Sequence, residues 1–217
     1  SSDAGINTFL VRVTDAAGAF SDATLTVKVV IPGALPPPWL KTDIGTVGLA
    51  GSAAYTNTVY TVRGAGDGLA STADGFFFVY QTLSADGEIK ARIASMDNTS
   101  VNARAGVMIR ETLTSGSKNA FMGVSPNGTF RFQRRTSTGG STSTSSGSTG
   151  VFPNVWIRLV RSGNSLTGYS SSNGVNWTKV GSQSINMASQ IHLGVAVTSA
   201  TRTALNKSVF DNVTVVP

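Results

Sequence analysis

The sequence contains no cysteine and a single histidine, and only 13% of its 217 residues carry a charge. Without cysteine, the chain can form neither a disulfide nor a thiolate nucleophile or metal ligand. No hydrophobic run approaches the length of a membrane span, and no signal peptide is recognisable. These absences predict a chain without a membrane partner. Its Ser, Thr, Gly and Asn content is typical of an extracellular β-protein.

The charges that are present are mostly basic, with 17 Lys and Arg against 11 Asp and Glu, a formal net charge of +6. Such an excess suits a nucleic acid or an acidic polysaccharide. The basic residues are scattered singly, however, and the run "FRFQRR" lacks the Gly-Phe-Gly-Phe core of an RNA-recognition strand. We therefore expect no nucleic-acid partner, and the charge slightly favours acidic or plant-wall polysaccharide.

Residues 1–30 predict a β-hairpin, because hydrophobic residues alternate on both sides of the turn in "NTFLVRVTDAAGAFSDATLTVKVV". This stretch resembles the last two strands of immunoglobulin-like and cadherin-like domains of bacterial surface proteins. Since two strands cannot make a stable core alone, the hairpin is expected to dock on something else. Residues 31–38, "IPGALPPP", are rich in proline and predict an interdomain linker.

From residue 39 to residue 217 the chain shows many short alternating runs separated by Gly, Asn, Ser or Asp turns, with no helical pattern. This predicts an all-β, two-sheet antiparallel β-sandwich. "SPNG" predicts a tight hairpin turn, so "TFRFQRR" becomes its second strand. The following residues 136–150, which are only Ser, Thr or Gly, are expected to form a long mobile loop.

The segments "ADGFFFVYQTLSADGEIKARI", "ARAGVMIRETLTSGSKNAFMGVSPNG", "WIRLVRSGNSLTGYSSSNGVNW" and "FDNVTV" together resemble a bacterial jelly-roll module. This module is concanavalin A-like and laminin-G-like, and is related to the C-terminal domain of β-xylosidases. The resemblance implies a non-catalytic carbohydrate-binding module, secreted or at the cell surface, that needs no cofactor. It would target other domains of the same parent chain to a polysaccharide or oligosaccharide. The alternative is a structural or adhesive spacer that makes protein contacts.

Candidate ligand residues follow from strand alternation. Val107 and Ile109 form the apolar face of their strand, which turns Arg110 to the other side. In "TFRFQRR" the phenylalanines are expected to point inward, leaving Arg131, Gln133 and Arg135 exposed. Guanidinium and amide groups can donate paired hydrogen bonds to sugar hydroxyls or a uronate carboxylate. The alternative, cross-strand pairing or cover for apolar surface, stays open.

Further ligand candidates are Asn119 and the aromatic residues Tyr80 and Trp177, since an aromatic ring can stack on a sugar. Trp177 follows an Asn-Gly turn in "SSSNGVNW" and resembles the turn tryptophan of Asp-box-like hairpins, which is usually structural.

The acidic residues predict no enzyme. The Glu-x-Asp-x-Glu strand of concanavalin A-like glucanases is missing: Asp86 and Glu88 fall in a turn, and Glu111 has no carboxylate two residues away. The only histidine, His192, lies in an apolar strand pattern and has no second histidine to join it.

A structural calcium ion is conceivable, because jelly-roll modules often tie their termini with one. Asp211 in the last strand is the first candidate ligand, and Asp43 near the first strand of the module is the second. An aspartate that accepts backbone amides is the alternative interpretation for both.

Overall fold

The computed structural model describes residues 6–28 and 33–217 and divides the chain into two compact units, Ser1–Ala34 and Leu35–Pro217. The described residues form strands, turns and loops, and none of them belongs to a helix. Accordingly, no helix in this part of the chain is long and apolar enough to cross a membrane. The predicted boundaries at residues 30 and 38 remain predictions, and residues 29–32 of the hairpin end and linker lie outside the described residues.

The first unit is the predicted hairpin. Strand β1 (Ile6–Thr14) pairs antiparallel with β2 (Phe20–Lys28), and Thr14 lies opposite Phe20. Asp15 shapes the turn, because its Oδ1 accepts the backbone N–H groups of Ala17 and Ala19, both at 2.9 Å. Leu10 is 69% exposed, and the other hairpin side chains whose burial the structure describes are exposed as well. The resemblance of this hairpin to the last two strands of immunoglobulin-like domains stays a prediction.

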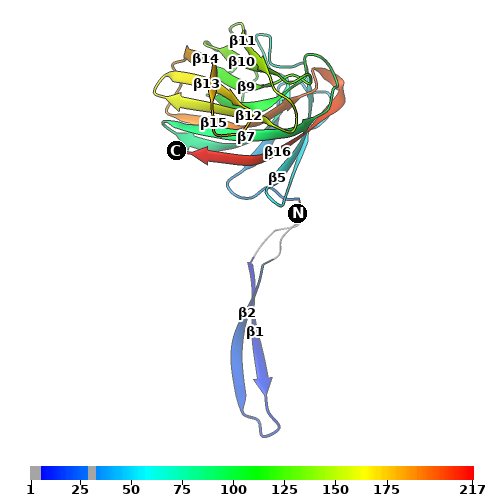
Figure 1. Ribbon diagram of the computed structural model, residues 1–217. Helices are drawn as coiled ribbons and strands as arrows, with labels where there is room; N and C mark the ends of the chain where they lie inside the picture. The colour runs from blue at the N-terminus through cyan, green and yellow to red at the C-terminus, as the bar shows by residue number, and fades with distance from the viewer. Residues whose placement is uncertain (1–5, 29–32) are drawn as a thin grey trace. The chain divides into compact units, whose positions relative to one another are not determined.

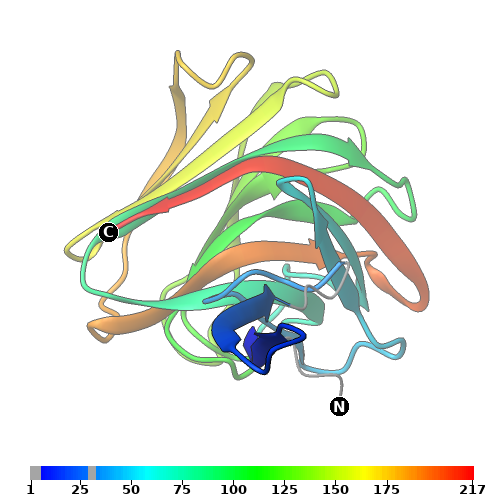
Figure 2. The same ribbon diagram turned by 90° about the horizontal axis from the view of Figure 1, so that it is seen from below.

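The second unit is an antiparallel β-sandwich of two seven-stranded sheets, which confirms the predicted fold class (Figures 1 and 2). Sheet 1 contains, in spatial order, β11 (Ser143–Thr149), β10 (Thr129–Arg135), β9 (Asn119–Val124), β8 (Arg104–Arg110), β15 (Gln190–Thr198), β6 (Phe76–Ser84) and β3 (Leu40–Ile44). Sheet 2 contains β14 (Thr178–Ser184), β13 (Ser165–Ser171), β12 (Val155–Ser162), β7 (Gly87–Met96), β16 (Thr201–Val216), β5 (Val59–Gly66) and β4 (Ser52–Thr56).

The main core lies between the sheets and follows the alternation of the sequence. Val107 and Ile109 of β8 are fully buried in it, as are Phe130 and Phe132 of β10, which are at most 3% exposed. Removing such side chains from water supplies the main driving force for folding, about 1.5–3 kcal/mol for each large residue. The predicted inward direction of both phenylalanines is confirmed.

A second, smaller apolar cluster covers the opposite face of sheet 1. Phe76, Phe78 and Tyr80 of β6 stack along this face, with Phe78 and Tyr80 parallel at 5.2 Å between ring centroids. Leu69 and Leu113, from the loops before β6 and after β8, complete the cluster. Sheet 1 is therefore buried on both faces over part of its area.

The Ser/Thr/Gly tract is not a single loop, because Ser143–Thr149 forms the edge strand β11. Its backbone pairs with β10, with Arg131 opposite Ser146 and Gln133 opposite Thr144. The lack of a side chain at Gly147 also lets β11 of sheet 1 pack closely against β14 of sheet 2. A Cβ at this position would lie 3.2 Å from the side chain of Val180. Tertiary pairing here outweighs the weak strand propensity of Ser and Gly.

Candidate functional site

The predicted ligand residues Arg110 and Arg135 form a buried cluster around Asp74, with no exposed side-chain surface on any of the three. Arg135 holds the carboxylate in a bidentate pair, with Nη2 to Oδ1 at 2.6 Å and Nη1 to Oδ2 at 2.9 Å. Arg110 Nη1 lies 3.5 Å from Oδ2, and Asn119 Nδ2 donates to the same oxygen at 3.3 Å. The structure thus brings together three of the predicted site residues, around an aspartate that the sequence did not single out.

The expected exposure of this group is wrong. Arg110 and Arg135 are 0% exposed and Gln133 is 2% exposed, although all three point away from the main core as predicted. Loops cover them: Arg135 donates to the carbonyl oxygens of Ser71 and Gly140, and Arg110 Nε donates to that of Thr112 at 2.7 Å. Burial lowers the pKa of Arg110 to about 10, against the opposing effect of Asp74. In this conformation these guanidinium groups hold loops and offer no surface to a sugar.

The other predicted ligand residues are dispersed. Tyr80 is 8% exposed and lies in the second apolar cluster, edge-on to His192. Trp177 directly precedes β14 of sheet 2, and the guanidinium carbon of Arg158 lies 6.0 Å from its ring centroid. Arg131, partly exposed, lies on sheet 1 and donates to the hydroxyls of Ser125 and Ser146. No single site collects the residues chosen from the sequence.

The two predicted calcium ligands belong to different sheets and have protein partners. Asp211 of β16 pairs with Arg92, Oδ1 with Nε at 2.7 Å, and this hydrogen bond lowers the pKa of Asp211. Asp43 of β3 accepts the backbone N–H of Gly51 at 3.1 Å, as in the alternative interpretation. Among the described residues, no three acidic or histidine side chains gather into a metal-binding group. Calcium stays a prediction.

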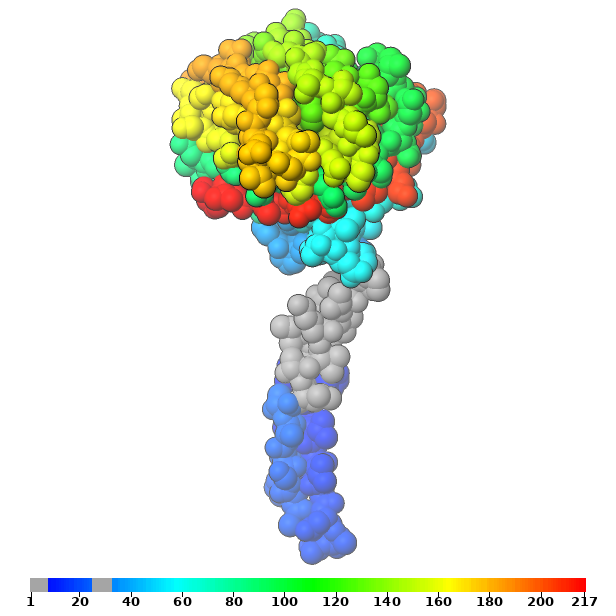
Figure 3. All heavy atoms as spheres, in the orientation of Figure 1, coloured from blue at the N-terminus to red at the C-terminus, as the bar shows by residue number. Residues whose placement is uncertain are grey.

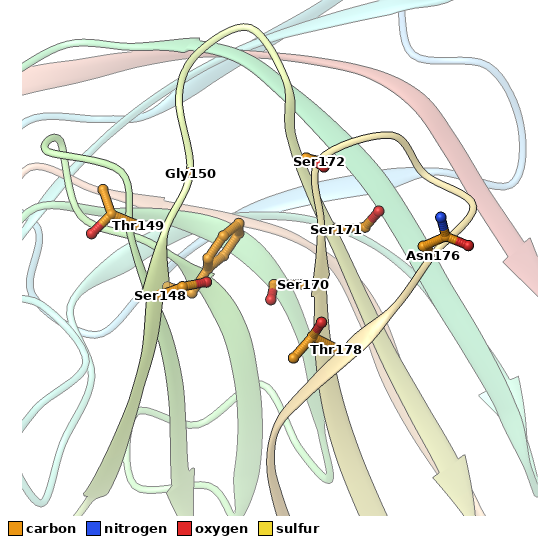
Figure 4. A pocket seen from close by; sticks show the side chains of 9 residues that line it. Ser148, Thr149, Gly150, Ser170, Ser171, Ser172, Asn176 and Thr178 are labelled. Atoms are coloured by element: carbon orange, nitrogen blue, oxygen red, sulfur yellow. The ribbon is translucent and has the colours of Figure 1, made fainter.

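A pocket of 260 Å³ opens where the β11 edge of sheet 1 meets the β13–β14 edge of sheet 2 (Figure 4). Figure 3 shows the surface of β14 (orange-yellow) beside that of β11 (yellow-green). The lining is entirely uncharged and consists of Phe130, Ser148, Thr149, Gly150, Ser170, Ser171, Ser172, Asn176 and Thr178.

Several hydroxyls in this pocket are available to a ligand. Ser148 reaches it from β11, Ser170 from β13 and Thr178 from β14 (Figure 4). None of these three side chains bonds to another group within residues 6–28 and 33–217. By contrast, Ser171 Oγ donates to Asn173 Oδ1 at 3.0 Å and accepts the N–H of Gly174 at 2.9 Å. Both sheets thus present free donors and acceptors to one small volume.

The turn after β13 fixes one wall of this pocket. Asn173 Oδ1 accepts the N–H groups of Val175 and Asn176, both at 2.9 Å. Gly174 has a φ of 72°, and a Cβ at this position would lie 2.8 Å from the Trp156 ring. These contacts hold Asn176 and Thr178 at the rim. The Asn-Gly turn could be recognised from the sequence, but the pocket could not. Ser and Thr are so frequent in the chain that their presence does not indicate a binding site.

No family model matches the chain, and no curated protein matches it. Solved structures do share its fold. A functionally unknown protein from Saccharomyces cerevisiae has 16% identity and a TM-score of 0.62, with 76% of this chain and 91% of that chain covered. A mutant of the GH43 protein BlXynB from Bacillus licheniformis has 9% identity and a TM-score of 0.57, with 94% and 45% covered.

The κ-carrageenase from Pseudoalteromonas carrageenovora, solved in complex with an oligotetrasaccharide of κ-carrageenan, matches 99% of this chain and 96% of its own. Its identity is 10% and its TM-score 0.53. At such identities the likeness defines the fold alone. The shared fold is the two-sheet jelly-roll sandwich, which is consistent with the concanavalin A-like fold that the resemblance implied.

The prediction that the chain is not an enzyme is contradicted by these neighbours. The carrageenase shares this fold over nearly its whole length, and a GH43 protein shares it over nearly all of the present chain. The prediction relied on a missing carboxylate motif, on a single histidine and on the resemblance to a non-catalytic module, whereas a carrageenase and a GH43 protein share this fold at 10% and 9% identity.

Proposed function

We propose that the sandwich binds carbohydrate, and that the hydroxyl-lined pocket between β11 and β13–β14 accepts a neutral sugar ring. The observation that carries this proposal is the convergence of free hydroxyls from Ser148, Ser170 and Thr178 above the buried ring of Phe130. A hydroxyl both donates and accepts hydrogen bonds, which matches the hydroxyls of a sugar. An apolar floor suits the C–H face of the ring.

The lining selects for uncharged ligands, because it contains no acidic or basic side chain. Its small volume accommodates one ring of a chain and leaves the neighbouring rings in solvent. Binding would therefore be weak, with dissociation constants of roughly micromolar to millimolar. That the carrageenase was solved with an oligosaccharide supports a glycan ligand for this fold in general. We place the protein outside the cell or at its surface, attached to polysaccharide.

Affinity electrophoresis in gels containing xylan or mixed-linkage β-glucan tests this assignment. The double variant Ser170→Ala, Thr178→Val removes two pocket hydroxyls and keeps the remaining shape. A net contribution of about 0.5–1.5 kcal/mol for each hydrogen bond predicts roughly 5- to 160-fold weaker binding of the double variant. Reducing sugar released in the same incubations reports hydrolysis.

Thr167→Val is the matched control, since Thr167 lies on the same strand but bonds to Ser182 outside the pocket. It should bind like the parent chain. Equal retardation of parent and double variant in every neutral glycan would refute the pocket assignment.

A further inference from the structure

A second cavity, of 310 Å³, lies at the opposite face of sheet 1 from the main core and has a different lining. Amide side chains come from Asn98, Asn102 and Asn127, a hydroxyl from Ser125, and a guanidinium from Arg131. No carboxylate is among the described residues that line it. The polar part of the lining therefore combines amide and hydroxyl groups with one positive charge and no negative charge.

A second guanidinium lies beside this cavity. Arg104 is 8% exposed, and its Nη1 donates to the carbonyl oxygens of Val101, a cavity residue, and Ala103, at 3.1 and 2.7 Å. Its Nε is buried and has no hydrogen-bond partner among the described groups. Burial, and after it the charge of Arg131, lower the pKa of Arg104 to about 10.

The two arginines share a feature that separates them from most others in the chain. Arg12, Arg92, Arg110, Arg135, Arg158 and Arg202 each lie within 4 Å of an aspartate or glutamate. In residues 6–28 and 33–217, neither Arg104 nor Arg131 has such a partner. Two neighbouring cations without a counter-charge, one of them desolvated, favour an external anion.

We propose that the cavity formed by Arg131, Asn102, Asn127 and Ser125, with Arg104 behind it, binds an anionic group of a polysaccharide, either a uronate carboxylate or a sulfate ester. Arg131 provides the charge at the surface, and the amides donate to the remaining oxygens. This site is separate from the neutral pocket, and either one can exist without the other.

A polysaccharide fits this cavity better than a nucleic acid does. Binding of single-stranded nucleic acid relies on aromatic side chains that stack on bases. The apolar residues in the lining are Val101 and Pro126, and no aromatic ring accompanies them. An isolated cationic pocket rimmed by amides suits single, spaced charges on a polymer.

Affinity electrophoresis with polygalacturonate, κ-carrageenan and neutral xylan tests the proposal. The two charged polymers distinguish carboxylate from sulfate as the ligand. Arg131→Gln removes the surface cation, and Asn102→Asp adds a repelling charge without removing an arginine. Each should weaken binding to at least one charged polymer about tenfold or more, since hydrogen bonds to charged groups are the strong ones. Neutral xylan should be unaffected.

Arg63→Gln is the control, because Arg63 is exposed on β5 of sheet 2 and the change lowers the net charge by the same single unit. If Arg63→Gln weakened binding to the charged polymers as much as Arg131→Gln does, the net charge of the protein would explain the binding. That result would overturn the proposal. So would the absence of binding to both charged polymers, or tighter binding of a single-stranded oligonucleotide. If Arg131→Gln fails to fold, Asn102→Asp decides alone.

Discussion

At the scale of single residues, the most consequential feature is a buried carboxylate that serves two arginines. Asp74, Arg110 and Arg135 have no exposed side-chain surface, and the cluster carries one more positive than negative charge. Taking charges out of water is costly unless partners compensate them. The carbonyl oxygens of the loops supply the rest of that compensation, which joins the loops to sheet 1.

Asp74→Asn should therefore be strongly destabilising. The change keeps the shape but leaves two guanidinium groups without their counter-charge, and breaking such a buried pair costs about 3–5 kcal/mol. Urea denaturation followed by tryptophan fluorescence measures the effect.

Asp67→Asn is the comparison for that experiment, because Asp67 pairs with Arg202 at the surface, where both side chains are more than half exposed. A surface pair contributes about 0–1 kcal/mol. A similar decrease in the free energy of unfolding for Asp67→Asn and Asp74→Asn would contradict the role given to the buried cluster.

At the scale of elements, glycines decide how closely the strands pack at the β11–β14 edge. Gly181 of β14 faces Phe132 of β10, so that a Cβ on the glycine would lie 2.5 Å from the ring. Gly168 of β13 makes a similar approach, at 2.7 Å. Because both positions are glycine, β13 and β14 of sheet 2 can pack directly against the fully buried ring of Phe132 in sheet 1.

Gly181→Ala should destabilise the fold by about 1–3 kcal/mol, because an extra methyl in a packed core forces side chains or backbone to shift. The adjacent Ser182→Ala changes an exposed position and should cost far less. Thermal unfolding of both variants checks this, and an unchanged midpoint for Gly181→Ala would mean that the ring moves freely.

At the scale of the whole molecule, the hairpin and the sandwich are two units with different means of stabilisation. The sandwich holds both sheets and both apolar clusters. The hairpin exposes Phe9, Leu10 and Val13 by 52%, 69% and 70%, and the described members of both clusters come from the sandwich. Two strands alone are marginally stable in water.

Residues 35–217 produced alone should fold with nearly the same melting temperature as the full chain, because every buried core residue that the structure describes lies in this unit. Differential scanning calorimetry of the two proteins makes the comparison. A large drop for the shorter chain would show that the sandwich depends on residues 1–34.

The sequence by itself determined which face each residue of the alternating strands occupies. Alternation with a period of two residues placed Val107, Ile109, Phe130 and Phe132 in the core and Arg110 and Arg135 on the other side, because side chains in a strand point alternately to opposite faces. The sequence could not determine which of these side chains are exposed to solvent, because alternation does not show whether loops cover the outer face of a sheet.

The tertiary structure alone decided which faces stay open and which residues meet. Loops distant in sequence brought Asp74 to Arg135 and buried the group chosen as the ligand face. Pairing with β10 turned Ser143–Thr149 of the serine-rich tract into a strand, and the contact of two sheet edges produced the pocket of Ser148, Ser170 and Thr178. These outcomes depend on long-range contacts, which local periodicity does not encode.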